Sequence, residues 1–316
     1  MRTTSILLLS LYSLISACTG STPQKPMQQV IDEAFKTSIE QYTLMAEKLA
    51  TNDSLLPRTF DGKQLITSDP HWWCSGFFPG SLWYLYEYSH NDSLLAYARQ
   101  YTARVECEKY TTDNHDIGFI LFCSFGNGLR LTGDPAYREV LHTGSKSLAT
   151  RYNPTVGLIR SWDFNKEVWE YPVIIDNMMN LEMLLWTAKA FKEPVYRDIS
   201  ISHANKTMKY HYRNDYSSYH VVSYDTITGL PHARHTHQGY AHESAWSRGQ
   251  AWGLYGYTFM YRETGDKTYL EQAKHIAHYL IHHPHMPKDY IPYWDMDAPD
   301  LSLIHISEPT RLQLIS

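Results

Sequence analysis

The junctions between predicted helices constrain the fold of this 316-residue chain more than any other feature. Thr132–Val140 and Thr264–Ala273 share the pattern Thr-Gly-Asp-x-x-Tyr, and weaker forms occur in HNDSLLAYARQY and KEPVYRDI. At each junction we expect one helix to end, Gly or Asn to form the turn, Asp to cap the next helix and Tyr to pack on it. Helical hairpins that recur at spacings of roughly 40 to 70 residues predict stacked helix pairs, arranged as an open solenoid or a closed toroid.

Apolar residues recur with the helical period along most of the chain. Long aromatic-rich inserts before alternate helices favour the toroid, in which inner helix ends converge on a central cleft, and we expect one domain. The stretch Tyr219–Asp225 looks β-like and is expected to form a hairpin in a loop. The first helix is expected at Met27–Ala50, with an apolar face at Val30, Ile31, Phe35, Ile39 and Tyr42. Eight further helices are expected near Gly76–Ser89, Asp92–Tyr110, Ile117–Leu131, Pro135–Arg151, Asn177–Phe191, Pro194–Tyr212, Ala245–Glu263 and Lys267–His283.

The N-terminus has the pattern of a secretory signal peptide. Arg2 provides a positive start, Ile6–Ile15 is apolar but too short to span a bilayer, and small residues directly precede Cys18. This last segment resembles a bacterial lipoprotein box, in which the cysteine becomes the acylated first residue. We therefore expect residues 1–18 to be a lipoprotein signal peptide and residues 19–27 a tether. The protein would be exported and lipid-anchored in the bacterial cell envelope, facing the periplasm or the cell surface.

The C-terminal residues 301–316 show no periodicity and no relation to the preceding sequence. They look like translated sequencing-adapter or vector sequence, so we leave them out of the fold and expect the natural C-terminus to be missing. The catalytic domain is assigned to residues 28–300. A toroid of roughly twelve helices would then be incomplete at the C-terminus, and we expect an open ring with exposed apolar edges.

Charge and composition exclude some functions and favour others. The net charge is -5 and basic residues form no blocks, so no nucleic-acid partner is expected. The chain has 25 Tyr and 9 Trp against 10 Phe. Rings with a polar edge suit a carbohydrate cleft, and a tyrosine-rich helical core would explain them equally well.

No metal site is expected from the cysteines and histidines. Apart from Cys18, the cysteines are odd in number and widely spaced, so they predict neither disulfides nor zinc ligands. The histidine-rich segments His232–His242 and His282–His285 lack both cysteine partners and the helical pairing of a zinc protease. We expect no metal and no cofactor, and interpret the segment His237–Tyr240 as a source of hydrogen bonds to a polar ligand.

Two aspartates that precede apolar helical segments are candidates for acid–base chemistry. Asp116 precedes Ile117 and Asp176 precedes Asn177. Either position also suits a helix N-cap, which keeps a carboxylate ionised because backbone N–H groups and the helix dipole stabilise its charge. A general acid instead needs a raised pKa, from burial or from a second carboxylate. The β-branched residues of YPVIID favour burial of Asp176, and two carboxylates at one cleft would divide the acid and base roles.

The segment WSRGQAWGLYGY combines a cation with aromatic rings at a helix entrance. Arg248 precedes Trp252 by four residues, so both side chains share a helix face. Guanidinium binds carboxylate in a bidentate manner and indole stacks on sugars, while a core Trp beside a snorkelling Arg is the alternative. Small residues at Gly249, Gly253 and Gly256 would let this helix approach others closely, as an inner toroid helix must.

Taken together, the segments WWCSGFFPGSLW, HDIGF, IIDNMMNLEML, HQGY, WSRGQAWGLYGY and YWDMDAP resemble the unsaturated glucuronyl hydrolases, glycoside hydrolase family 88. The resemblance extends from Val30 to Asp300 and implies an all-α (α/α)6 toroid that uses no metal. It implies that Asp176 is the general acid and base and that Asp116 lies beside it at the reacting sugar. His115 then helps to shape the cleft. Substrate-binding positions implied by the resemblance are His220, Gln238 and Arg248, with ring stacking at Trp73, Trp162 and Trp252.

The activity implied by this resemblance is hydrolysis of oligosaccharides that carry a 4,5-unsaturated uronic acid at the non-reducing end. Asp176 would protonate C4 and then activate a water that adds at C5, after which the hemiketal opens and releases the aglycone. Two alternatives stay open at this point. One is a related toroid enzyme, such as an unsaturated rhamnogalacturonyl hydrolase or a sugar epimerase. The other is a non-catalytic glycan-binding lipoprotein that uses its aromatic residues alone.

Overall fold

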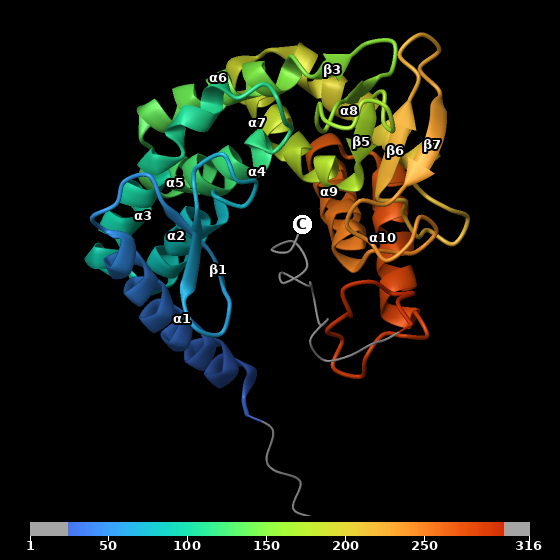
Figure 1. The fold of residues 1–316 in the computed structure, drawn as a ribbon. Coiled ribbons are helices and arrows are strands. Elements are labelled where there is room, and N and C mark those ends of the chain that lie inside the picture. The colour runs from blue at the N-terminus through green and yellow to red at the C-terminus, as the bar shows by residue number, and fades with distance from the viewer. Residues whose placement is uncertain (1–24, 300–316) are drawn as a thin grey trace, which may run out of the picture.

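Helical hairpins follow one another around an arc in this computed structural model, which describes residues 25–299. The arc begins with α1 and ends with α10, and within the described residues it stays open between these two helices (Figure 1). The predicted signal peptide, most of the tether and the adapter-like tail lie outside the described residues, so these boundaries stay predictions.

Each predicted helical segment contains an α-helix. The α-helices are α1 (Met27–Leu49), α2 (Phe77–Ser89), α3 (Asp92–Arg104), α4 (Ile117–Leu121), α5 (Asn127–Thr132), α6 (Pro135–Ala149), α7 (Leu181–Phe191), α8 (Pro194–Tyr210), α9 (Ser247–Thr264) and α10 (Lys267–His282). Three shorter helices accompany them: the 3-10 helices η1 (Glu106–Tyr110) and η3 (Ile175–Asn180) and the π-helix η2 (Phe122–Gly126).

Three predicted helices are not continuous α-helices. The segment Asp92–Tyr110 is α3 followed by η1, and Asn177–Phe191 begins in η3 before α7. The segment Ile117–Leu131 is α4, the π-helical turn η2 and then α5. Side-chain hydrogen bonds compete with the helical ladder there, because Ser124 Oγ donates to the carbonyls of Ile120 and Leu121. Such π-helical turns inside an α-helix are often found beside functional sites.

The two Thr-Gly-Asp junctions have the predicted structure. Gly133 and Gly265 end α5 and α9 in the left-handed conformation, with φ of 69° and 74°. Asp134 then accepts a hydrogen bond from the backbone N–H of Ala136, and Asp266 caps α10 in the same way. The two weaker junctions differ from the prediction. Between α2 and α3, His90 forms the turn and Asn91 caps the next helix. Between α7 and α8, Lys192 forms the turn and Glu193 makes no side-chain cap.

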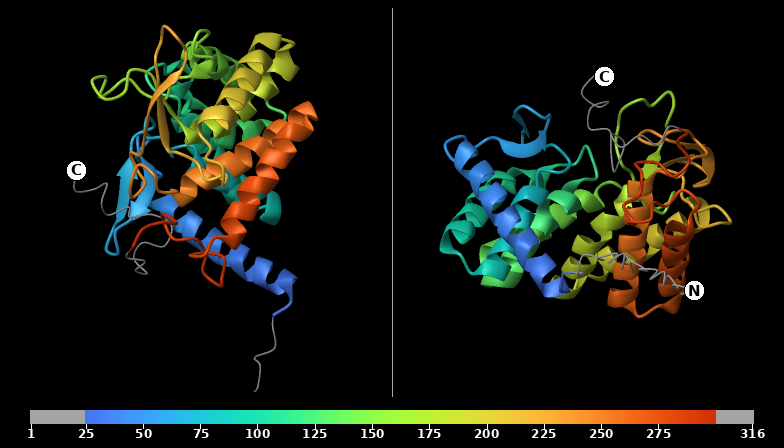
Figure 2. Two further views of the ribbon diagram at one scale, coloured as in Figure 1. Left: turned by 90° about the vertical axis from the view of Figure 1, so that its right-hand side faces the viewer. Right: turned by 90° about the horizontal axis from the view of Figure 1, so that it is seen from below.

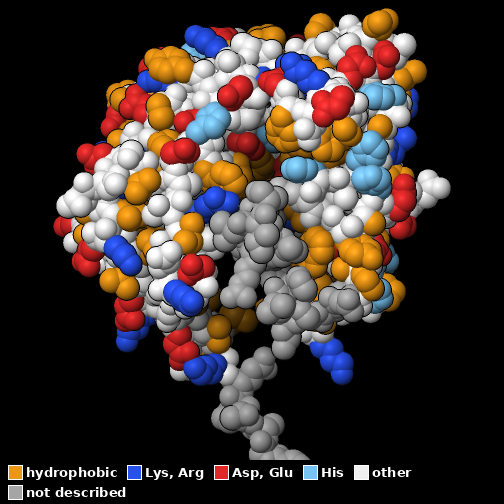
Figure 3. Space-filling view, in the orientation of Figure 1, with side chains coloured by type: hydrophobic (Ala, Val, Ile, Leu, Met, Phe, Trp, Pro, Cys, Tyr) orange, Lys and Arg blue, Asp and Glu red, His pale blue; other side chains and the backbone are white. Residues whose placement is uncertain are grey.

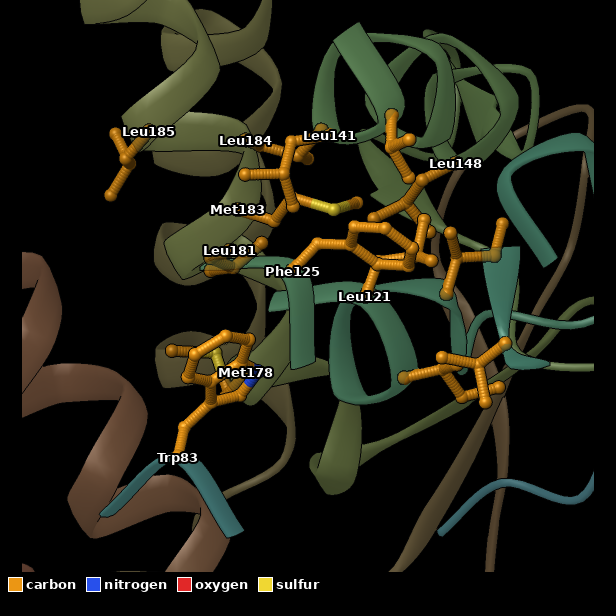
Figure 4. Close-up of a cluster of buried hydrophobic side chains, with 14 of the residues drawn as sticks. Trp83, Leu121, Phe125, Leu141, Leu148, Met178, Leu181, Met183, Leu184 and Leu185 are labelled. Atoms are coloured by element: carbon orange, nitrogen blue, oxygen red, sulfur yellow. The ribbon is translucent and has the colours of Figure 1, made fainter. Parts of the chain in front are cut away.

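The hydrophobic core lies between the inner helices, which border the centre of the arc, and the outer helices, which lie behind them. Figure 4 shows Leu121 and Phe125 of the α4–η2 segment directed toward Leu141 of α6 and Met183 of α7. All four side chains are almost completely buried. Burial of such a layer between consecutive hairpins supplies the main favourable free energy of folding and fixes the order of the hairpins around the arc.

The inner helices approach each other closely at glycines. A Cβ at Gly76 would lie 2.1 Å from the carbonyl oxygen of Ile120, and one at Gly256 would lie 2.5 Å from Met178 Cβ. Gly118 at the start of α4 contacts Asn180 of η3 in the same way. No larger residue fits between these backbones, so the glycines bring the starts of the inner helices together.

Within residues 25–299, seven short strands lie in the segments between helices. They are β1 (Leu56–Phe60), β2 (Leu65–Ser68), β3 (Tyr152–Asn153), β4 (Leu158–Ile159), β5 (Pro172–Ile174), β6 (Val221–Tyr224) and β7 (Pro231–His235). The predicted hairpin around Tyr219–Asp225 is confirmed as β6–β7, and β5 adds a third antiparallel strand to it. In this sheet Ile174 pairs with Val221, which pairs with His235.

The first half of α1 extends beyond the body of the arc (Figures 1 and 2). Val30 and Ile31, predicted on its buried face, are therefore 44% and 37% exposed. Further along the helix, Phe35, Ile39 and Tyr42 pack against the core as predicted. The amphipathic pattern thus predicted the buried side of the second half of α1, whereas the first turns of this helix are exposed among the described residues.

Replacing Gly118 with Ala tests the close packing of the inner helices. The new Cβ would lie 2.4 Å from Asn180 Oδ1. Asn180 Oδ1 also accepts a hydrogen bond from Phe119 N (3.2 Å), so Asn180 cannot move away without losing it. We expect Gly118→Ala to lower the free energy of unfolding by about 1–3 kcal/mol, measured by urea denaturation.

Gly126→Ala is the matched control for this substitution. The atoms nearest to a Cβ at Gly126 belong to the partly exposed Phe122 ring, at 3.1–3.4 Å, which has to move by only a few tenths of an ångström, and helix propensity favours Ala over Gly. The urea concentration at which half of Gly126→Ala is unfolded should equal or exceed that of the unsubstituted 316-residue chain. Equal destabilisation by the two substitutions would contradict the proposed role of the glycine contacts.

Candidate active site

One end of the three-stranded sheet places Asp176 beside His220. Asp176 follows β5 by two residues and lies in the first turn of η3. His220 directly precedes β6, and its carbonyl accepts a hydrogen bond from Ile175 N (3.1 Å). Because β5 and β6 are antiparallel, the end of one strand meets the beginning of the other. The side chains then approach to 3.7 Å between His220 Nε2 and Asp176 Oδ2.

Asp116 enters the same region from the start of α4. Its backbone N–H donates to Asn114 Oδ1 (2.8 Å), and its Oδ1 lies 3.3 Å from His115 Nε2. Asp116 occupies the N-cap position of α4 without making a side-chain capping bond, and the N-cap residue of η3 is Ile174 rather than Asp176. The interpretation of these two aspartates as helix caps was therefore wrong, and both carboxyls are available for chemistry.

Burial raises the pKa of both carboxyl groups. It raises the pKa of Asp116 to about 7, helped by the negative charge of Asp176. Burial also raises the pKa of Asp176 to about 6, while the Arg248 guanidinium and N–H groups of the backbone and Trp252 oppose the change. Two interacting carboxyls titrate as a pair, so near neutral pH they hold a proton between them. That is the state a general acid requires.

The two histidines beside these carboxyls are neutral. Burial lowers the pKa of His115 to about 3 and that of His220 well below its usual value. His115 Nδ1 lies 3.3 Å from Ser161 Oγ, and His220 packs against the Trp246 ring at a centroid distance of 4.6 Å. A neutral imidazole beside a carboxyl offers a polar contact without the positive charge that would ionise that carboxyl.

Arg248 brings a positive charge to the site at the start of α9. Its guanidinium donates to Gln238 Oε1 (2.9 Å) and lies over the rings of Trp73 (4.9 Å) and Trp246 (4.4 Å). Burial lowers the pKa of Arg248 to about 10, so the side chain is still charged at neutral pH. The contacts with two rings and an amide fix the orientation of a planar donor that matches a carboxylate.

Four aromatic rings form a continuous cluster beside Arg248. Trp73 contacts Phe77 and Phe119 at centroid distances of 5.8 and 6.2 Å. Trp252 contacts Phe119 at 5.2 Å and stacks with Phe77 at 6.5 Å. The predicted stacking residues Trp73 and Trp252 are thus brought together on one side of the site, both partly exposed.

Trp162 lies in a second aromatic cluster. Its ring is 7% exposed and stacks under Phe164 at 4.9 Å, with Trp169 and His237 at its edges. Phe164 is 48% exposed and presents its outer face instead. The arrangement does not favour direct stacking of a sugar on Trp162, whose role stays a prediction, and Phe164 is the accessible ring of this cluster.

The histidine-rich segments form ring contacts and hydrogen bonds. His235 lies 4.5 Å from the His242 ring and accepts a hydrogen bond from Trp169 Nε1 (3.0 Å), while His232 contacts Ser223. Among residues 25–299, no cluster of three or more His, Cys, Asp or Glu side chains is arranged to hold a metal ion.

Several polar residues that support the site were not identified from the sequence. Asn180 links α4 to η3 through its bonds with Phe119 N and Asn177 Oδ1. Ser161 contacts His115 and accepts a hydrogen bond from Ile174 N. Their only sequence signal is a polar residue inside an apolar stretch, which does not identify a partner far along the chain.

Figure 3 shows acidic and histidine side chains beside a hollow near the centre of the face that Figure 1 presents. Of the predicted site residues, eight are connected by the contacts described above. They are Asp116, Asp176, His115, His220, Gln238, Arg248, Trp73 and Trp252. The arrangement provides a protonated carboxyl, a fixed cation and a partly exposed aromatic surface, which together suit acid catalysis on an anionic sugar.

Comparison with known proteins agrees with this site. The chain matches the model of Glycosyl Hydrolase Family 88 over residues 50–263. It is 41% identical over 305 residues to an unsaturated glucuronyl hydrolase of Formosa agariphila, covering 94% of this chain and 75% of that protein. An unsaturated chondroitin disaccharide hydrolase of Streptococcus pyogenes serotype M1 is 32% identical over 273 residues, covering 85% of this chain and 67% of that protein.

Solved structures show the same fold. The crystal structure of an unsaturated glucuronyl hydrolase specific for heparin matches with a TM-score of 0.83 and 47% identity, over 86% of this chain and 72% of that one. The predicted all-α toroid is thereby confirmed as the fold class. The family model, the relatives and the fold agree, and this chain belongs to glycoside hydrolase family 88.

Proposed function

We propose that this enzyme removes a 4,5-unsaturated uronic acid from the non-reducing end of oligosaccharides produced by polysaccharide lyases. The observation that carries the proposal is the pair of carboxyls, Asp116 and Asp176, both with raised pKa. Asp176 is buried near the charged Arg248, and the Asp116 side chain is 21% exposed. The names of the relatives from Formosa agariphila and Streptococcus pyogenes support this substrate class. A module that only binds glycans has no need of a buried carboxyl with a raised pKa.

Asp176 is proposed as the general acid and base. The substrate carries an enol ether conjugated to a carboxylate. The Asp176 carboxyl transfers its proton to C4, the C4=C5 π electrons form the new C–H bond, and positive charge develops at C5 and the ring oxygen. The Asp176 carboxylate then takes a proton from a water whose oxygen bonds to C5. The resulting hemiketal opens to a keto acid, and the hemiacetal left at C1 releases the aglycone alcohol.

Asp116 is proposed as the supporting carboxyl. A second carboxyl close to Asp176 keeps the proton within the pair, because two adjacent negative charges repel each other. One carboxyl performs both proton transfers, so the separation rule that distinguishes retaining from inverting glycosidases does not apply to this reaction.

Substrate contacts are assigned from the charge and shape of the site. Arg248 binds the uronate carboxylate, and the partly exposed rings of Trp73 and Trp252 face the sugar. Gln238, which accepts from Arg248, orients that guanidinium. An unsaturated rhamnogalacturonyl hydrolase or a sugar epimerase on the same toroid is the alternative. Release of a keto-uronic acid from one lyase product but not from another distinguishes the proposed activity from these.

Replacing Asp176 with Asn tests the assignment of the acid. Loss of a positioned acid–base group is expected to lower kcat by about 10²- to 10⁴-fold. The measurement is the decrease in ultraviolet absorbance of the conjugated enoate, with unsaturated disaccharides from heparin and chondroitin as substrates. Asp198→Asn, an exposed carboxylate on the outer helix α8, is the control and should keep full activity. If Asp176→Asn keeps most of its activity while Asp116→Asn loses it, the two roles are reversed.

The pH dependence of the reaction tests the coupling between the carboxyls. The acid must be protonated, so kcat/KM should fall on the alkaline side with an apparent pKa in the range of about 6 to 7 set by the pair. Asp116→Asn removes the neighbouring negative charge, so Asp176 loses its proton at lower pH. The alkaline limb of the residual activity should therefore move to lower pH. A limb that stays in place would show that the carboxyls titrate independently.

We further propose that the protein is exported and lipid-anchored through Cys18, as the signal-like N-terminus and the lipoprotein-box resemblance suggest. These residues lie outside the described part of the chain. Within residues 25–299, no helix is both long and apolar enough to cross a bilayer.

Replacing Cys18 with Ala tests the anchor in a bacterial host. The variant should lose incorporation of labelled palmitate and leave the membrane fraction, because an acyl chain is the proposed attachment. Cys107→Ala, at an exposed cysteine of η1, is the control and should be labelled normally. Palmitate labelling that persists in Cys18→Ala would contradict the proposal.

A further inference from the structure

His220 accepts two hydrogen bonds at the same ring nitrogen. The backbone N–H groups of His237 and Gln238 both point at His220 Nδ1, at 3.0 and 3.1 Å. A backbone amide can only donate, so Nδ1 must present its lone pair. In a neutral imidazole the proton then has to be on Nε2, and the loop after β7 thereby determines the tautomer of His220.

The Nε2–H group of His220 faces the proposed acid. Nε2 lies 3.7 Å from Asp176 Oδ2, and both atoms are buried without a hydrogen-bond partner among the described residues. The distance is slightly too long for a hydrogen bond, as is common for catalytic contacts before substrate binds. A donor at Oδ2 disfavours a proton on that oxygen and so helps to orient the Asp176 carboxyl.

The loop that determines the tautomer is attached to Asp295. Asp295 is completely buried, and its Oδ2 accepts hydrogen bonds from Tyr240 N (2.8 Å) and Ser244 Oγ (2.7 Å). A Cβ at Gly239 would lie 3.0 Å from the same oxygen, so the loop packs directly on the carboxylate. The other oxygen, Oδ1, accepts from Asp297 N (3.0 Å).

A continuous series of contacts therefore runs from the last described segment of the chain to the site. Backbone bonds from Ser247 N to Trp294 O and from Met296 N to Ala245 O hold the Asp295 segment against the start of α9. Asp295 holds the loop, the loop holds His220 Nδ1, and His220 Nε2 faces Asp176.

We propose that Asp295 is a positioning residue for the reaction, which acts through the 236–240 loop and His220 to direct an N–H donor at Asp176 Oδ2. The inference rests on the proposed function for its effect on turnover, and its structural part is independent of it. The titratable and charged groups near His220 on neighbouring elements are Asp176, His237, Arg248, His211 and His115. All are unchanged in the variants below.

Asp295→Asn keeps the size of the side chain and removes one acceptor. The amide has one carbonyl oxygen, so its NH2 group must face either the Tyr240 and Ser244 donors or the Asp297 N–H. In either orientation one donor opposes another, which displaces the side chain or the turn that carries it and so loosens the loop. The misplacement is expected to lower kcat by about 10- to 100-fold with little change in KM.

The tautomer itself can be measured without activity. In protein labelled with 15N-histidine, the two ring nitrogens of His220 differ in chemical shift according to which carries the proton, and the spectrum of His220→Gln identifies its signals. We expect a neutral ring with the proton on Nε2 between pH 5 and 8. In Asp295→Asn we expect mixed tautomers or titration within this range.

Asp297→Asn is the matched control on the same segment. Asp297 Oδ2 accepts from Ala245 N (2.8 Å) and makes no contact with the 236–240 loop through its side chain. This variant should keep the His220 spectrum and kcat. Ser244→Ala removes a single bond to Asp295 and should show a smaller shift in the same direction as Asp295→Asn, which provides a test if that variant does not fold.

Two results would overturn the inference. One is a natural chain whose His220 carries its proton on Nδ1 or is charged near neutral pH. The other is a His220 spectrum and kcat that are unchanged in both Asp295→Asn and Ser244→Ala. Failure of the natural chain to turn over any unsaturated disaccharide would count against the proposed function instead, and the spectra would still decide whether Asp295 positions His220.

Discussion

Two carboxyl groups close to each other, Asp176 buried and Asp116 largely shielded from solvent, are the constraint on which the rest of this structure depends. Burial of an ionised carboxylate is costly unless it is paired, so a buried pair retains a proton. Here the pKa of both Asp116 and Asp176 is raised, and the histidines beside them are neutral. A charged imidazole in either position would ionise its partner and remove the acid. The neutral histidines therefore provide polar contacts without a positive charge.

Two structural devices bring these carboxyls together. Glycines such as Gly118 let the starts of the inner helices approach until backbone meets backbone, which sets the position of Asp116 relative to η3. The antiparallel sheet does the same for Asp176 and His220, because the pairing of Ile174 with Val221 joins the end of one strand to the start of the next. The helical hairpins thus supply the frame, and three short strands between them supply the position of the acid.

The sequence predicted those parts of this arrangement that depend on neighbours along the chain. Helical period located every α-helix, and the Thr-Gly-Asp junctions predicted the glycine turns and aspartate caps, because each is formed within a few residues. The π-helical turn in η2 and the burial of Trp162 under Phe164 depend on contacts that a period cannot show. Asp295 lies 55 residues beyond its loop partner Tyr240, and no local pattern connects them. Asp116 and Asp176 were candidates because each precedes an apolar helical segment, and the three β-branched residues before Asp176 predicted its burial. The division of roles between the two came from the family resemblance.

Burial and Arg248 change the pKa of Asp176 in opposite directions, and the proposed substrate would alter this balance. In the free enzyme Arg248 lowers the pKa of Asp176 and so works against the protonated form. A uronate carboxylate bound to Arg248 would neutralise that guanidinium and bring its own negative charge toward Asp176. Both changes raise the pKa of Asp176, by the rule that like charges favour the neutral acid. The pKa of Asp176 would therefore be highest, and the carboxyl most fully protonated, when the substrate is bound. An uncharged sugar would not raise the pKa in this way. The same cation that selects the substrate then also prepares the acid for it.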